Sequence, residues 1–284
     1  MRCFQLAPLL AGALLGCAPA PPSVAPVNQA VRAADTVATR DTTVNPLVPP
    51  LEAYLRGWMP LRPTRVESFL QEHPEYDGRG VLIAILDSGI DAGAPGLGLT
   101  STGERKILDL RDFSGEGAVA LSPVSLKGES VVAGGQRLGG LSRVRALMVG
   151  TRGYAGAIAE RPLGQLPASD LNGDGDDGDT LAVLVVRLTD AWAVFADTDG
   201  DGSLEDESPV RDYLRGRETF GWHQGQSPSP ISVAVNLRDG PSAPVLDLVF
   251  DNSSHGTHVA GIAAGYEMYG VAGFNGVAPG AFLV

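Results

Sequence analysis

The sequence predicts an α/β domain that is interrupted by a large, mostly β insert. An unbroken apolar run at residues 81–86 is typical of a strand buried on both faces of a parallel sheet. Small residues fill positions 255–265, which we expect to form a helix packed closely on that sheet. Between these segments, residues 113–242 hold short strand-like runs separated by Gly, Pro and Asp turns, which indicate β structure.

The composition indicates a globular chain with a strongly acidic segment. The 284 residues are 44% hydrophobic, which is enough to bury the core of one or two domains. The formal net charge is −12, and the segment from Asp170 to Glu207 holds twelve acidic residues and one arginine. Because phosphate binding requires positive charge, this composition argues against nucleic acid as a partner.

The chain begins with a targeting signal, residues 1–17. Arg2 precedes an apolar run that is too short to span a bilayer, and the run ends in Leu-Leu-Gly-Cys. This ending resembles the lipobox of bacterial lipoproteins, which implies that Cys17 carries a lipid anchor in the cell envelope. Ala18 resembles the class sorted to the outer membrane. An ordinary signal peptide with an incidental cysteine is the alternative. Cys3 would leave with the signal, so no disulfide is expected.

A tether and the first part of the folded domain follow. Residues 18–50 are rich in Pro, Ala, Ser and Thr without an apolar period, which predicts a flexible, Pro/Ala-rich linker. The first part of the domain is expected over residues 51–112. It contains a short amphipathic helix from about Thr64 to Glu72, which ends before Pro74.

The strand at residues 81–86 ends in Asp87. Open α/β sheets place their functional groups at the carboxyl ends of parallel strands, so Asp87 is a candidate functional residue. The alternative is a structural carboxylate that caps the turn through Ser88 and Gly89.

The insert, residues 113–242, is predicted to hold most of the β structure. The candidate strands of the insert are Ser142–Val149, Thr180–Leu188, Ala191–Ala196 and Ile231–Leu237. A further strand, Val245–Phe250, is expected in the second part of the domain, residues 243–284. The second and third strands of the insert are expected to form a hairpin that turns at Thr189 and Asp190.

Two motifs carry the candidate catalytic residues. Asp87 stands in LDSGID, and His255 stands in HGTHVAG. These motifs resemble the Asp and His segments of the subtilisin-like serine peptidases, and residues 275–284 resemble that family's next strand. The resemblance implies a subtilisin-like parallel sheet flanked by helices. It also implies that His255 acts as general base, while Asp87 orients its ring and stabilises the imidazolium.

The predicted helix contains glycines at 256, 261 and 265, and each interior glycine costs about 1 kcal/mol relative to alanine. We interpret them as allowing close packing on the sheet and leaving room for substrate. His258 is expected to pack beneath the site. A zinc pair formed with His255 is disfavoured, because zinc peptidase helices use a four-residue spacing with an intervening Glu.

A narrower resemblance concerns the tripeptidyl peptidase II-like branch of this family, through residues 87–117 and 191–213. In the family, the nucleophile lies in a Gly-Thr-Ser-x-Ala segment and an Asn completes the oxyanion hole. Both are expected beyond Val284, as are the acidic residues by which that branch holds a substrate amine. We therefore expect the 284 residues to be the inactive N-terminal part of a longer peptidase.

Two acidic stretches of the insert, DLNGDG and DTDGDG, have calcium-loop spacing. Oxygen-bearing side chains alternate before a Gly turn, as in an EF-hand loop. The candidate ligands of a structural calcium ion are Asp170, Asn172, Asp174, Asp197, Asp199 and Asp201. The EF-hand glutamate is replaced by Leu181 and Ser208, so solvated turns are the alternative. The predicted hairpin would bring both loops to one end, where calcium would screen their charges.

The sequence thus predicts a lipid-anchored, serine-type peptidase that acts on peptide or protein substrates and needs no cofactor for catalysis. The alternative is a non-catalytic, calcium-stabilised surface binding module on a peptidase scaffold. The presence of both Asp87 and His255 favours the peptidase, since a binding module needs neither.

Overall fold

The computed structural model describes residues 59–162, 168, 170–222 and 231–284. All of them belong to one compact unit, residues 45–284. The predicted signal with Cys17 and the predicted tether lie outside the described residues. In the described part of the chain, no helix has the length and apolarity required to cross a bilayer.

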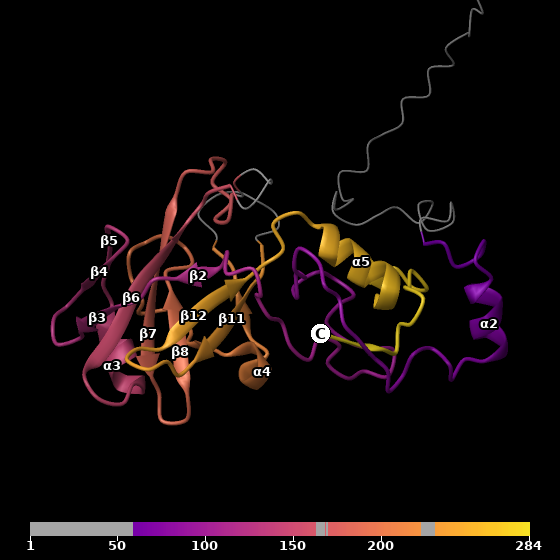
Figure 1. The fold of residues 1–284 in the computed structure, drawn as a ribbon, viewed down its shortest axis with the longest axis horizontal. Helices are drawn as coiled ribbons and strands as arrows, with labels where there is room; N and C mark the ends of the chain where they lie inside the picture. The colour runs from indigo at the N-terminus through magenta and orange to yellow at the C-terminus, as the bar shows by residue number, and fades with distance from the viewer. Residues whose placement is uncertain (1–58, 163–167, 169, 223–230) are drawn as a thin grey trace, which may run out of the picture. The chain divides into compact units, whose positions relative to one another are not determined.

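The α/β part is built on parallel strands that come from distant parts of the sequence. Strand β1 (Leu82–Ile83) pairs in parallel with β13 (Phe282–Leu283), with Leu82 opposite Phe282. A parallel bridge between Ile107 and Leu283 extends the pairing on the other side of β13. The yellow C-terminal strand therefore lies beside the indigo segment that precedes the insert (Figure 1).

Two helices and one 3₁₀ turn accompany these strands. Helix α2 (Val66–Glu72) confirms the predicted N-terminal helix, although it begins two residues later than expected, and it ends before Pro74. Helix α5 (His255–Ala264) confirms the predicted small-residue helix. The 3₁₀ turn η1 (Met268–Gly270) follows it.

The prediction that residues 81–86 are buried on both faces is wrong for the described structure. Val81 is 51% exposed, Leu82 is 55% exposed and Leu86 is 90% exposed. Ile83 and Ile85 instead pack against the buried core of the α/β part. The run is uniformly apolar, but described elements cover only one of its faces, so alternate side chains remain exposed.

The larger sheet of the insert is antiparallel and has five strands. Its order is β3 (Ser122–Ser125), β6 (Arg152–Ala159), β7 (Thr180–Arg187), β8 (Trp192–Ala196) and β9 (Val210–Arg211). The predicted hairpin is confirmed, because β7 and β8 are antiparallel neighbours with Arg187 opposite Trp192. At the turn, the Leu188 N–H donates to the Ala191 C=O. A separate hairpin joins β4 (Val131–Ala133) to β5 (Gln136–Leu138).

A second antiparallel sheet has four strands (Figure 1). Its order is β10 (Thr219–Phe220), β11 (Val233–Arg238), β12 (Val245–Val249) and β2 (Ala118–Val119). The insert was expected to end at residue 242. Because β12 pairs with both β11 and β2, the antiparallel structure continues to Val249, directly before the segment that leads into α5.

The predicted strand at residues 142–149 is wrong. Residues Leu141–Leu147 form helix α3 instead, and a second short helix, α4 (Tyr213–Gly216), also lies in the insert. Leu141 and Val144 are buried, whereas Ser142 and Arg143 between them are exposed. A spacing of three between buried residues matches the helical period, and the period of two expected of a strand is absent.

Hydrophobic residues are buried in three clusters. Two clusters occupy the insert, one between its two sheets and one on the other face of the five-stranded sheet under α3. The third gathers residues of the α/β part, including Ile90, Leu97, Ala260, Ala264 and Leu283. The small side chains of α5 thereby belong to the core that supports the end of β1.

Candidate active site

Asp87 and His255 lie together although they are 168 positions apart in the sequence. Asp87 follows the apolar run that contains β1, and His255 is the first residue of α5. Oδ1 of Asp87 lies 2.7 Å from Nδ1 of His255, so the hydrogen bond expected from the two motifs is present. The side chain of His255 is 67% exposed and that of Asp87 is 19% exposed.

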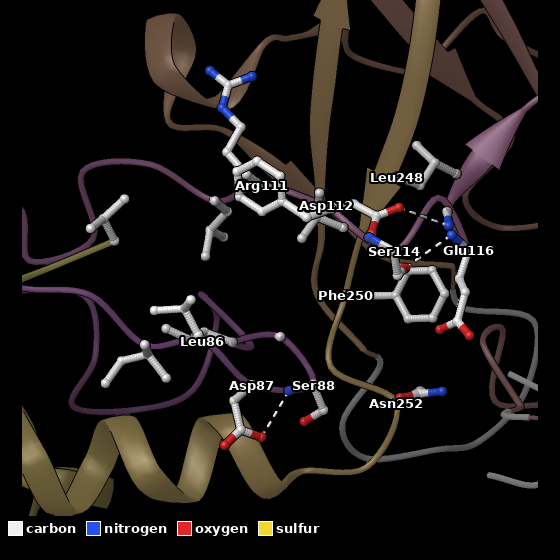
Figure 2. A pocket seen from close by; sticks show the side chains of 18 of the residues that line it. Leu86, Asp87, Ser88, Arg111, Asp112, Ser114, Glu116, Leu248, Phe250 and Asn252 are labelled. Atoms are coloured by element: carbon white, nitrogen blue, oxygen red, sulfur yellow. Dashed lines mark hydrogen bonds between the residues drawn. The ribbon is translucent and has the colours of Figure 1, made fainter. Parts of the chain in front are cut away.

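The carboxylate of Asp87 is held by two donors. Besides the His255 ring, the backbone N–H of Ser88 donates to Asp87 Oδ1 at 2.8 Å, as the lower dashed line in Figure 2 shows. The bond from His255, followed by the bond from the Ser88 N–H, lowers the pKa of Asp87. An ionised carboxylate favours the tautomer that carries its proton on Nδ1, which leaves Nε2 as the proton acceptor.

Glycine at position 256 allows α5 to approach Asp87 closely. A Cβ on Gly256 would lie 1.9 Å from the carbonyl oxygen of Gly89 and 3.2 Å from the Cβ of Asp87. Our interpretation of the helix glycines therefore holds at this position. It is wrong for Gly261 and Gly265, where an added Cβ would meet the side chain of Met268 rather than the sheet.

The expectation that His258 packs beneath the site is also wrong. His258 is exposed, whereas Gly256, Ala260, Gly261 and Ala264 form the buried face of α5. Residues three apart on a helix share a face, so His258 lies on the same exposed side as His255.

Three residues near the pair were missed by sequence reasoning, namely Ser88, Asp251 and Thr257. Asp251 is buried and accepts hydrogen bonds from the hydroxyl groups of both Ser88 and Thr257. Asp251 stands two residues after the end of strand β12. A carboxylate at the end of an apolar strand was the signal that could have identified it.

A cavity of about 580 Å³ lies beside Asp87. Figure 2 shows Leu86, Asp87 and Ser88 on one side of it, and Arg111, Asp112, Ser114 and Phe250 on the other. The lining comes from the end of β1, from the turn at residues 110–117, from β12 and the residues that follow it, and from Val284. Its side chains are largely apolar, and Phe113 in the turn is 95% exposed.

The first acidic loop differs from the predicted ligand set of Asp170, Asn172 and Asp174. Both oxygens of Asp170 accept loop N–H groups, from Gly173 and Gly175, and Asn172 donates to Asp179. The carboxylate oxygens that lie within 4.8 Å of one another belong instead to Glu160, Asp176 and Asp179. Burial raises the pKa of Glu160.

The second loop repeats this arrangement. Both oxygens of Asp197 accept loop N–H groups, from Gly200 and Gly202. Asp197 and Asp199, which were predicted, gather with Glu207, which was not, while Asp201 accepts the N–H of Ser203. Burial raises the pKa of both Asp197 and Glu207. The first cluster lies in the connection between β6 and β7, and the second in the connection between β8 and β9, so each loop gathers its own set of carboxylates.

Comparisons with known proteins agree with the geometry. The profile of the Subtilase family matches residues 78–284. Tripeptidyl-peptidase 2 of Oryza sativa subsp. japonica is 31% identical over 296 residues, which cover 82% of this chain and 21% of that protein. Pyrolysin of Pyrococcus furiosus is 31% identical over 267 residues, which cover 85% of this chain and 18% of pyrolysin.

A solved structure is similar as well. The crystal structure of Tripeptidyl Peptidase 2 (TPP II) matches with a TM-score of 0.56 and 25% identity, over 76% of this chain and 21% of that one. The chain thus spans about a fifth of the length of the relatives it matches. The predicted fold class, a subtilase-like α/β fold, is confirmed. With the family profile covering most of its length, the chain belongs to the subtilase family of serine peptidases.

Proposed function

We propose that this protein hydrolyses peptide bonds in peptide or protein substrates by acyl transfer to a serine. The observation that carries the proposal is the 2.7 Å hydrogen bond between Asp87 and His255, in the motifs that resemble the family's Asp and His segments. The family relationship supports it, since the relatives named above are tripeptidyl-peptidases and pyrolysin.

In this mechanism His255 moves the proton. Nε2 of His255 takes the proton of the serine hydroxyl as the serine attacks the scissile carbonyl, and later gives it to the leaving amine. Asp87 accepts the hydrogen bond from Nδ1–H throughout and stabilises the imidazolium that forms between these steps. The exposure of the His255 ring gives a substrate and a nucleophile room to reach Nε2.

Ser88 and Ser253, two of the three serines next to the motifs, are poor candidates for the nucleophile. The hydroxyl of Ser88 donates to Asp251 and accepts from the N–H of Gly256, and the hydroxyl of Ser253 accepts from the N–H of His255. The 284 residues also contain no Gly-Thr-Ser-x-Ala segment. We therefore propose that the nucleophile and the oxyanion-hole Asn belong to further chain.

Labelling with a fluorophosphonate probe tests the proposal, because the probe reacts covalently with an activated serine. We expect the 284-residue chain to stay unlabelled, and a protein extended to include a Gly-Thr-Ser-x-Ala segment to label and to cleave peptides. Labelling of the 284-residue chain would show that one of its own serines is the nucleophile. An extended protein that neither labels nor cleaves would establish the non-catalytic binding module instead.

We also propose that each acidic loop of the insert binds a structural calcium ion. Carboxylate oxygens are the hard ligands that calcium prefers, and three come together in each cluster. Glu160, Asp197 and Glu207 are buried, and a buried carboxylate beside other carboxylates is unfavourable unless a cation compensates the charge. Glu160, Asp179 and Glu207 would complete the loops in place of the missing EF-hand glutamate. Calcium would stabilise the insert and would take no part in the peptidase chemistry.

We propose, finally, that Cys17 carries a lipid and attaches the protein to a bacterial envelope membrane, with the outer membrane favoured by Ala18. The support is the Leu-Leu-Gly-Cys ending of the signal and the Pro/Ala-rich segment that follows it.

A further inference from the structure

Asp251 is a buried carboxylate close behind the Asp87–His255 pair. It lies between β12 and α5, four positions before His255, and is 5% exposed. Its Oδ1 accepts from the Ser88 hydroxyl at 2.8 Å and from the Ser253 N–H at 3.2 Å. Its Oδ2 accepts from the Thr257 N–H at 2.8 Å and from the Thr257 hydroxyl. One carboxylate therefore receives four hydrogen bonds.

These bonds join the two segments that carry the pair. Ser88 follows Asp87, and its Oγ both donates to Asp251 and accepts from the N–H of Gly256 at 3.0 Å. Gly256 in turn follows His255. Asp251 and the hydroxyl of Ser88 thus connect the neighbours of Asp87 and of His255 across 163 sequence positions.

Asp251 also completes the N-terminus of α5. The N-cap residue Ser254 has a φ of 61° and makes no capping bond with its side chain. The first N–H groups of the helix are instead accepted by the hydroxyls of Ser253 and Ser88 and by the carboxylate of Asp251. A negative charge at this end of a helix interacts favourably with the helix dipole. The direction of the first turn, which carries His255, consequently depends on Asp251.

We propose that Asp251 is a positioning residue, which holds Asp87 and His255 at hydrogen-bond distance by tying the Asp87 loop to the first turn of α5. The peptidase part of this inference rests on the proposed function, but the geometric part does not. Asparagine at position 251 would replace one accepting oxygen with an amide that donates. The amide group would then face the backbone N–H of Ser253 or that of Thr257, which can only donate, and the tie would weaken.

The proposal is tested on the 284-residue chain by proton NMR of the His255 Nδ1–H, whose signal is assigned by its loss in Asp87→Asn. We expect Asp251→Asn to shift or broaden this signal while far-UV circular dichroism shows a folded protein. The matched control is Asp91→Asn. The carboxylate of Asp91 accepts from the Gly93 N–H and interacts with Ser232, whereas the bond from Asp91 to Thr257 of α5 comes from its backbone N–H, which the variant keeps.

The outcomes separate a positioning role from a purely structural one. A folded Asp251→Asn chain with an unchanged signal, or an equal change in Asp91→Asn, would overturn the proposal even if the melting temperature fell. Should Asp251→Asn fail to fold, Ser88→Ala decides, because it removes the hydroxyl that joins Asp251 to Gly256 and keeps the backbone N–H that bonds Asp87. A broadened signal in Ser88→Ala supports the proposal and an unchanged signal overturns it.

A kinetic measurement on a peptidase-active, extended protein adds a second readout. We expect Asp251→Asn to lower kcat by roughly 10- to 100-fold with little change in KM, because a misplaced general base affects the chemical step. An unchanged kcat would overturn the positioning role. If the unsubstituted extended protein has no activity, the proposed function fails, and the NMR comparison still decides what Asp251 does.

Discussion

Gly89 and Gly256 meet backbone against backbone at the point where the Asp87 loop touches α5. A Cβ on Gly256 would lie 1.9 Å from the carbonyl oxygen of Gly89, and a Cβ on Gly89 would lie 2.6 Å from the carbonyl oxygen of Phe250. At both positions the obstructing atoms belong to the backbone, which yields less easily than the end of a flexible side chain. The distance between Asp87 and His255 therefore depends on the absence of a side chain at these two glycines.

Gly256→Ala should separate the two segments. We expect a loss of about 1–3 kcal/mol in the free energy of unfolding, as for other overpacked sites, and a loss of the His255–Asp87 hydrogen bond. Thermal unfolding and the His255 Nδ1–H signal measure the two effects. Gly98→Ala is the matched control, because no atom lies within 4 Å of the added Cβ. Equal stability of the two variants would contradict the close contact.

The two histidines of α5 should differ in their effect on catalysis. In an active, extended protein, His255→Ala should lower kcat by about four to six orders of magnitude, as expected for loss of a general base. His258→Ala should leave kcat nearly unchanged and alter the free energy of unfolding by less than about 0.5 kcal/mol, because its side chain is exposed. A comparable loss of kcat in both variants would contradict the assignment of His255.

Lys106 should make the stability of the chain rise with pH in the alkaline range. Its side chain is buried, and Nζ donates to the carbonyl oxygens of Pro279 at 2.7 Å and Ala281 at 3.3 Å. Burial lowers the pKa of Lys106 from 10.5 to about 8. Between these values the unfolded chain binds a proton that the folded chain lacks, so the free energy of unfolding increases by up to about 1.4 kcal/mol per pH unit.

Denaturant unfolding from pH 7 to pH 11 measures this effect. The free energy of unfolding of Lys106→Met should not increase with pH in this way. Lys127→Met, which changes an exposed lysine, should still show the increase. Burying a charged Lys106 lowers the free energy of unfolding in full below pH 8, and this penalty disappears above pH 10.5. Lys106→Met should therefore be more stable than the unsubstituted chain mainly at neutral pH. Parallel curves for all three proteins would mean that Lys106 keeps an ordinary pKa.

Calcium should raise the melting temperature of the chain. One ion at 100 times its dissociation constant stabilises the folded state by about 2.7 kcal/mol. Glu207→Gln should remove most of the gain from the second loop, and Asp179→Asn most of the gain from the first. Asp206→Asn removes an adjacent exposed charge outside the cluster and should preserve the response. Identical melting curves with calcium and with chelator would leave both loops as solvated turns.

Metabolic labelling with a radioactive fatty acid tests the lipid anchor. Cys17→Ala should abolish labelling and leave an uncleaved or released product, because the acyl chains attach at this cysteine in lipoproteins with a lipobox. Cys3→Ala should label normally, since Cys3 lies within the predicted signal. Retained labelling of Cys17→Ala would show that the resemblance to a lipobox is coincidental.

Local sequence patterns were sufficient for several parts of the molecule. Pro74 limits α2 to the residues before it, and the apolar runs on either side of Thr189 and Asp190 predicted the β7–β8 hairpin, because its partners are neighbours along the chain. The motifs around Asp87 and His255 identified the pair through their resemblance to a family. In each case the information lies within a few residues, where spacing and turn chemistry operate.

Other features depended on contacts between distant segments. The helix at Leu141–Leu147 was misread as a strand because its length is too short for periodicity to decide, and burial of Leu141 and Val144 settles it. The exposure of Leu86 and of His258 likewise depends on which surfaces neighbouring elements cover. Glu207 joins the second acidic cluster one position earlier than an EF-hand would place its glutamate, since the strands flanking the loop determine where its end lies.

The role inferred for Asp251 depends most strongly on contacts between distant segments. Its place at the end of an apolar strand marks it as a candidate, but the local sequence does not reveal its partner, because Ser88 is 163 positions away. Only when the antiparallel insert brings β12 back beside the end of β1 does one buried carboxylate meet donors from both segments. Residue types that can do the chemistry are therefore readable from the sequence, whereas the geometry that makes them act together arises from tertiary contacts.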